Sequence, residues 1–295
     1  MNLKMMSVVP GIRYSTTPAP AQADDPSDRL VVDIDRQIPR RTPGVTLRRG
    51  LEYRDGLRLD LHTPAGAGPF PLVVYLPGGG FVMAPRGSAR RAREFVSAAG
   101  YAVAGVQYRT TRQNAVYSDG VADARAAIDY LVGHADTYGI RPDRVAVWGE
   151  SAGGYLASLT GLADPRIRAV VNQFGVSDPT RIADGFDARM RTAVADPQHP
   201  MHRYRAAEAN PIDLVRPGAP PFLLLHGDDD RIIPPAQTLL LHRALQAADG
   251  GGSTRYLLAG AGHGPLSLTR RQARQWTSVQ VMTIITDFLQ RHLLP

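Results

Sequence analysis

The segment Gly149-Glu150-Ser151-Ala152-Gly153 constrains the fold of this chain more than any other part of the sequence. It is a G-x-S-x-G pattern, and it lies between the short apolar run 145–148 and a run of helical character from Tyr155 to Leu162. A strand, a sharp turn and a helix in that order form the setting in which this pattern presents a serine at the end of a sheet. The turn crowds its neighbours, so small residues must flank the serine. We therefore predict that Ser151 is a nucleophile whose hydroxyl is held clear of the backbone.

Apolar runs typical of buried strands alternate along the chain with segments of helical periodicity. The predicted strands are 58–61, 72–76, 102–108, 145–148, 169–174, 222–225 and 254–258, and the predicted helices are 88–99, 118–131, 151–162, 235–248 and 272–293. This alternation predicts an α/β fold with a mostly parallel central sheet flanked by helices on both faces. In such a sheet, ligands bind beyond the carboxyl ends of the strands.

One long segment and the N-terminus depart from this alternation. Residues 176–214 are polar and rich in arginine, and they are longer than a simple connection between two strands. We expect them to form a small cap over the site, within one domain of residues 41–295. Residues 1–40 are expected to be an N-terminal extension that is partly flexible, because residues 15–28 are rich in Pro, Ala, Asp and Ser.

The composition of the chain excludes several classes of function. The 295 residues include no cysteine, which excludes disulfides, thiolate metal sites and a cysteine nucleophile, and we expect neither a metal nor a cofactor. The net charge is +7, but basic and aromatic residues do not cluster as they do in nucleic-acid-binding modules, so no nucleic-acid partner is expected. No apolar run reaches the ~18 residues of a membrane span, and no secretory signal is recognisable, so we predict a cytoplasmic protein. The oligomeric state is not readable from the sequence.

A nucleophilic serine needs a base that removes its proton and an acid that orients the base. His263 lies among small residues after the last predicted strand, and it follows the serine and the acid in the chain order that this type of site requires. The acid comes from the run Asp228, Asp229 and Asp230, and spacing alone does not choose among the three. Two of them are expected to make loop hydrogen bonds instead.

The same chemistry needs N–H donors for the oxyanion. The glycine triplet 78–80 follows a buried strand, and a backbone N–H approaches a substrate oxygen closely only where no Cβ intrudes. The N–H of Ala152 is the second predicted contribution, at the positive end of the helix after the serine. The residues that follow the triplet are Phe81, Val82 and Met83. They are interpreted either as the wall of an acyl pocket or as plain core, since apolar residues are usually buried in the core.

Six segments of the chain together resemble the α/β-hydrolases, and among them the esterases related to hormone-sensitive lipase and the feruloyl- and acetyl-xylan-esterase-like hydrolases. In chain order the segments are 74–81, 106–109, 123–127, 149–154, 226–234 and 262–264. The resemblance implies the α/β-hydrolase fold, places the acid on Asp230, and places the oxyanion donors on Gly79, Gly80 and Ala152. The family usually has a histidine where this chain has Pro77, so we expect the oxyanion loop to be held in a different way.

These observations lead to the hypothesis of a serine hydrolase of the carboxylesterase type. Ser151, His263 and Asp230 would cleave a small-molecule carboxylic ester through an acyl-enzyme intermediate. The same triad would serve an acyltransferase or a cyclising thioesterase, in which an amine or an alcohol replaces water. The third hypothesis is a non-catalytic binding protein that has kept the fold and lost turnover.

Overall fold

The computed structural model describes residues 29–30, 32–182, 191–192, 196–197, 199, 210–249 and 252–294. Most of the predicted cap, 176–214, lies outside the described residues, and so do residues 1–28 and residue 31 of the predicted extension. The cap and the division into a domain and an extension therefore stay predictions.

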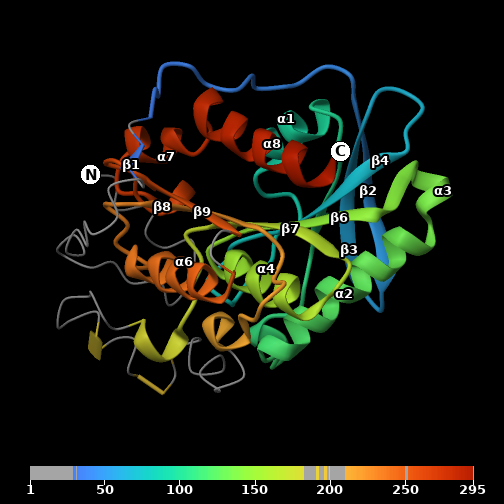
Figure 1. The fold of residues 1–295 in the computed structure, drawn as a ribbon. Coiled ribbons are helices and arrows are strands. Elements are labelled where there is room, and N and C mark those ends of the chain that lie inside the picture. The colour runs from blue at the N-terminus through green and yellow to red at the C-terminus, as the bar shows by residue number, and fades with distance from the viewer. Residues whose placement is uncertain are drawn as a thin grey trace.

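A nine-stranded sheet runs through the centre of the described part (Figure 1). The strands lie in the order β1-β9-β8-β7-β6-β4-β5-β3-β2. Neighbours from β1 to β5 in this order are parallel, and the two pairs at the other edge, β5 with β3 and β3 with β2, are antiparallel. This confirms the prediction of a mostly parallel sheet. The bounds are β1 Arg29–Leu30, β2 Val45–Arg54, β3 Leu57–Pro64, β4 Phe70–Leu76, β5 Ala102–Val106, β6 Ile140–Glu150, β7 Ile167–Gln173, β8 Phe222–Gly227 and β9 Ser253–Leu258.

Helices cover both faces of the sheet, with α1 and α8 above it and α2, α4 and α6 below it in Figure 1. The bounds are α1 Arg90–Ala98, α2 Tyr117–Gly133, α3 Ala135–Tyr138, α4 Ala152–Ala163, α6 Ala236–Asp249, α7 Arg270–Gln275 and α8 Val279–Leu293. Each face has its own hydrophobic core: in β4, Leu72 and Val74 belong to one core, and Val73 and Tyr75 to the other. Alternate side chains of a strand point to opposite faces, so a strand between two cores is apolar throughout, as the run 72–76 predicts.

The single helix predicted over 272–293 is wrong, because the chain forms α7 and α8 with a break at 276–278. Ser278 begins α8 as its N-cap, and its side chain accepts a hydrogen bond from the N–H of Val281. The carbonyl of Thr277 accepts from the N–H of Ile38, 3.1 Å away. A break stabilised by a segment so far away in sequence leaves no trace in the helical periodicity.

Part of the predicted extension 1–40 belongs to the sheet. Strand β1 pairs in parallel with β9 at the edge of the sheet. Beyond it, the carbonyl of Arg36 accepts from the N–H of Val279, and the side chain of Ile38 is only 1% exposed in the core under α8. The described residues before position 40 therefore contribute to the stability of the domain formed by the sheet and its helices.

The turn from β6 into α4 shows why small residues flank Ser151. Ser151 has φ 55° and ψ −122°, a backbone conformation that costs free energy in a residue with a side chain. A Cβ added to Gly149 would overlap the carbonyl oxygen of Gly153, and one added to Gly153 would overlap the carbonyl oxygen of Leu76. The turn is therefore compatible only with glycine at both positions, which agrees with the steric argument from the sequence.

We expect Gly153→Ala to lower the free energy of unfolding by about 1–3 kcal/mol or more, because the new methyl group meets backbone that has no room to move. Denaturant unfolding measures the change. Gly133→Ala is the matched control, since an added Cβ there has open space in a helix, and it should be neutral or stabilising by up to about 1 kcal/mol. Equal stabilities for the two variants would contradict the steric account of the turn.

We expect Ile38→Ala to cost about 2–5 kcal/mol in the free energy of unfolding, as for other large buried side chains. The control is Leu268→Ala, because Leu268 is 44% exposed and its truncation should stay within about 0.5 kcal/mol. Urea unfolding of both variants tests whether the segment before position 40 is part of the domain. A loss at Ile38 no larger than that at Leu268 would show that the segment contributes nothing to it.

Candidate active site

Three predicted site residues meet at the carboxyl ends of β6, β8 and β9. The Oγ of Ser151 lies 2.8 Å from Nε2 of His263, and Nδ1 of His263 lies 2.7 Å from Oδ2 of Asp230. The serine is 8% exposed, the histidine 3% and the aspartate 1%. The arrangement can move a proton from the serine hydroxyl to an imidazole whose other nitrogen is held by a carboxylate.

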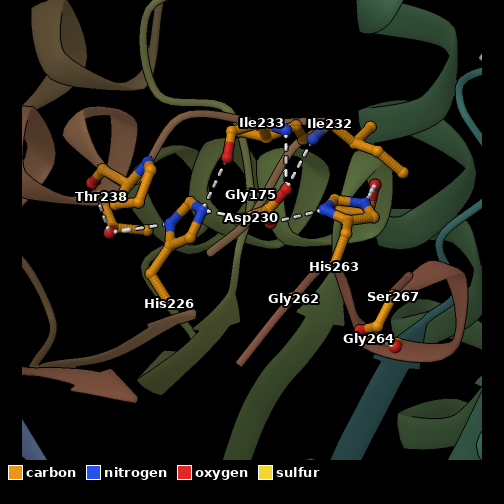
Figure 2. Close-up of polar contacts among 12 residues, drawn as sticks. Gly175, His226, Asp230, Ile232, Ile233, Thr238, Gly262, His263, Gly264 and Ser267 are labelled. Carbon is orange, nitrogen blue, oxygen red and sulfur yellow. Dashed lines mark hydrogen bonds and ion pairs between the residues drawn. The ribbon is translucent and has the colours of Figure 1, made fainter. Parts of the chain in front are cut away.

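The carboxylate of Asp230 is buried but well supplied with donors (Figure 2). Its Oδ1 accepts hydrogen bonds from the backbone N–H groups of Ile232, at 2.8 Å, and Ile233, at 2.9 Å. Burial by itself would raise the pKa of Asp230. The neighbouring His263 and hydrogen bonds with His226 and His263 outweigh burial and hold the pKa of Asp230 well below its ordinary value. This carboxyl is therefore ionised near neutral pH.

The other two aspartates of the run make loop contacts. Oδ1 of Asp228 accepts from the N–H of Gly260, and Asp229 pairs with Arg231 at 2.9 Å and accepts from the side chain of Gln272. Neither contact involves His263. The three-fold ambiguity of the sequence is resolved by geometry, since Asp230 alone of the three contacts the imidazole.

An aromatic stack that sequence reasoning missed supports the imidazole of His263. The ring of Phe174 packs edge-on against it, with centroids 4.7 Å apart, and Trp276 packs edge-on against Phe174 at 4.5 Å. Nε1 of Trp276 donates to the carbonyl of Gly262, 2.9 Å away. Phe174 has φ 41°, so its backbone is strained to bring the ring to this place. No pattern in the sequence marks either residue, because each acts through contacts with distant segments.

The glycine loop 78–80 lies beside the turn at Ser151. A Cβ on Gly78 would come within 3.2 Å of the Cβ of Ser151, so only glycine lets the two backbones lie this close. Gly79 accepts hydrogen bonds from the N–H groups of Val82 and Met83, which closes the loop into a turn, and Gly80 has φ 60°. Within the described part of the chain, the N–H groups of Gly79, Gly80 and Ala152 form no hydrogen bond.

The loop is braced where the family usually has a histidine. The buried hydroxyl of Tyr108 donates to the carbonyl of Pro77 at 2.7 Å. Next to it, Arg109 makes a two-pronged ion pair with Asp123 of α2, with Nη2 and Oδ1 2.8 Å apart. The matching segments 106–109 and 123–127 thus position the loop and the neighbouring helix. Tyr108 supplies a side-chain hydrogen bond to the loop that the side chain of Pro77 cannot form.

Phe81 contributes to the core below the loop. Its ring is 3% exposed and packs edge-on against Tyr155 of α4, with centroids 5.6 Å apart. Its carbonyl accepts from the N–H and the hydroxyl of Thr111, both at 2.9 Å. These contacts agree with the interpretation of Phe81 as core. A substrate-binding role for Phe81, Val82 and Met83 stays a prediction.

Glu150, the first of the two variable residues of the G-x-S-x-G pattern, is a titratable group that sequence reasoning did not consider. Its side chain lies against Gly78 and lines a cavity of ≈ 240 Å³, together with Trp148, Gln173 and Trp276. Burial raises the pKa of the Glu150 carboxyl above its ordinary value, although the Tyr75 hydroxyl and the nearby His263 favour the charged form. A second carboxyl therefore lies close to the candidate site.

The described residues contain no group of three or more His, Cys, Asp or Glu side chains that could hold a metal ion. Among the same residues, no helix combines the length and the apolar character needed to cross a bilayer.

The family model BD-FAE matches residues 59–245, which is more than half of the chain. Among curated proteins, the chain is 31% identical to the probable carboxylic ester hydrolase LipM of Mycobacterium tuberculosis over 58% of this chain and 43% of LipM. It is 29% identical to the esterase LipC of the same organism over 66% of this chain and 53% of LipC. The chain spans about half the length of the curated relatives that it matches.

Solved structures show the same fold. The propionate-bound esterase Est2 of Thermogutta terrifontis is 25% identical, with a TM-score of 0.65 over 86% of this chain and 97% of Est2. A truncated carbohydrate esterase from gut microbiota is 21% identical, with a TM-score of 0.67 over 85% of this chain and 97% of that protein, a likeness that concerns the fold alone. The sheet, the turn at Ser151 and the family match together show that the chain has the α/β-hydrolase fold and belongs to the BD-FAE family.

Proposed function

We propose that the protein is a carboxylesterase-type serine hydrolase that cleaves a small-molecule carboxylic ester through an acyl-enzyme intermediate. The observation that supports this most is the pair of short contacts, 2.8 Å and 2.7 Å, that joins Ser151 to His263 and His263 to Asp230. These residues come from three separate segments, and a chance meeting of hydroxyl, imidazole and carboxylate in this order is improbable. The names of LipM, LipC and Est2 as ester hydrolases point to the same reaction.

The proposed reaction has two halves. In the first, Nε2 of His263 takes the proton of Ser151 while Oγ attacks the ester carbonyl carbon, and the tetrahedral intermediate then expels the alcohol, which receives that proton from Nε2. In the second, water attacks the acyl-serine by the same route, the ester bond to Oγ breaks, and the acid leaves. Asp230 stabilises the imidazolium of His263 and keeps its own charge, which its lowered pKa favours.

The N–H groups of Gly79, Gly80 and Ala152 are the proposed donors to the oxyanion. Their lack of partners within the described part of the chain supports this role, because a free N–H beside the nucleophile is available to a developing negative charge. The N–H of Ala152 also lies at the N-terminal end of α4, where the helix dipole favours an anion. The contact from Tyr108 to Pro77 would hold this loop in place between the two half-reactions.

A cytoplasmic location stays the prediction made from the sequence.

We expect Ser151→Ala to lower kcat by roughly 10⁶-fold on p-nitrophenyl esters of graded acyl length, because the nucleophile is lost. The wild type should also form a covalent adduct with a fluorophosphonate, and Ser151→Ala should form none. Adding an alcohol or an amine to the assay and measuring the products separates hydrolysis from acyl transfer. A wild type that neither turns over esters nor forms the adduct would instead be a binding protein with this fold.

We expect Asp230→Asn to lower kcat by about 10⁴-fold, since the amide no longer holds His263 in the tautomer that accepts the serine proton. Asp229→Asn is the matched control, because the side chain of Asp229 contacts Arg231 and Gln272 and not His263, and its kcat should change little. Steady-state kinetics on one ester measures both. Equal losses for the two variants would remove Asp230 from its proposed role.

A further inference from the structure

A chain of buried hydrogen bonds continues behind Asp230, on the side away from His263 (Figure 2). Nε2 of His226 lies 3.3 Å from Oδ2 of Asp230 and 3.0 Å from the carbonyl oxygen of Ile233. Nδ1 of His226 lies 3.0 Å from Oγ1 of Thr238, and Nε of Arg255 donates to that same Oγ1 at 3.2 Å. His226 and Thr238 are fully buried. His226 lies at the carboxyl end of β8, and Thr238 lies near the start of α6.

The contacts determine which nitrogen of His226 carries the proton. A carbonyl oxygen only accepts hydrogen bonds, so the contact with Ile233 requires a proton on Nε2. Burial lowers the pKa of His226, so the ring is neutral and Nδ1 has a free electron pair. The hydroxyl of Thr238 must then donate to Nδ1.

The hydroxyl of Thr238 has one proton and two neighbouring acceptors, Nδ1 of His226 and the carbonyl of Pro235, 3.2 Å away. Arg255 favours the first of them. Its Nη2 donates to the carbonyl of Pro235 at 3.2 Å, so that oxygen has a donor without the hydroxyl of Thr238, and its Nε donates to the oxygen of Thr238. The unprotonated Nδ1 of His226 has the hydroxyl of Thr238 as its donor.

The opposite tautomer of His226 would break this arrangement. Its Nε2 would present an electron pair to Oδ2 of Asp230 and to the carbonyl oxygen of Ile233. In a buried site, these two oxygens and the unprotonated nitrogen would repel one another. With the proton on Nε2, the ring instead gives Asp230 a donor on the side opposite His263.

We propose that Thr238 and Arg255 are positioning residues that hold His226 in its Nε2-protonated form, and that His226 in turn orients the carboxylate of Asp230 toward His263. This inference rests on the proposed function of Asp230 as the acid of the triad. None of the three residues touches the reacting atoms, and each acts through the next.

The kinetic test compares Thr238→Val with Thr238→Ser. Valine has nearly the same shape and no hydroxyl, so kcat should fall about 10- to 100-fold while KM changes little, because the carboxylate loses its orientation. Serine keeps the hydroxyl and should restore kcat to near the wild-type value. Thr160→Val is the matched control, since the hydroxyl of Thr160 is buried and makes no hydrogen bond, and its kcat should equal that of the wild type. A kcat for Thr238→Val within twofold of that for Thr238→Ser would overturn the proposal.

The second test reads the tautomer without using activity. Long-range ¹H–¹⁵N correlation spectra of protein labelled in its histidines, with His226 assigned by its contacts to Thr238 and Ile233, should show a protonated Nε2 and an unprotonated Nδ1 at pH 7. Thr238→Val should show a mixture of tautomers and a shifted Nδ1–H resonance for His263. A wild-type ring with its proton on Nδ1, or on both nitrogens, would overturn the proposal.

The two tests separate the positioning proposal from the proposed function. A wild type without esterase activity whose His226 nevertheless has the Nε2–H tautomer, dependent on Thr238, would contradict the function and support the positioning chain. An active wild type whose His226 has the other tautomer would support the proposed function and contradict the positioning chain.

Discussion

The contact of backbone with backbone around residue 151 is the constraint on which the rest of the structure depends. The serine sits at φ 55° between glycines whose missing Cβ atoms let the turn pack against Leu76 and against the first residues of α4. The strain is sustained because residues 145–149 of β6 are paired with strands on both sides and α4 is buried under the sheet. A rigid frame therefore holds a strained residue at the carboxyl edge of the sheet.

Electrostatics around Asp230 add a second requirement. A buried carboxylate is costly unless donors compensate it, and here two backbone N–H groups and two imidazoles surround it. Burial and these donors act in opposite directions on the pKa of Asp230, and the donors prevail. The neutral ring of His226 matters for this balance, because it supplies a hydrogen bond without adding a second positive charge beside His263.

Much of the local structure was predictable, because it depends on short-range patterns. The apolar run 72–76 and the periodicity of 118–131 identify β4 and α2, with boundaries that differ by a few residues. The strand–turn–helix setting locates Ser151, and the small residues around His263 mark the loop after β9. The break between α7 and α8, strand β1, and the stack of Phe174 and Trp276 were missed, because each depends on contacts between segments far apart in the chain.

By itself, the sequence determined the fold class, the positions of the serine and the histidine, and the need for small residues around the serine, since these follow from periodicity and from the steric limits of one turn. The choice of Asp230 over its two neighbours followed only from family spacing until the loop geometry singled it out. The tertiary structure alone decided that Tyr108 braces Pro77, and that the hydroxyl of Thr238 lies where it can donate a hydrogen bond to Nδ1 of His226. Hydrogen bonds depend on distance and direction in space, and residues 31 positions apart acquire both only when the sheet has assembled.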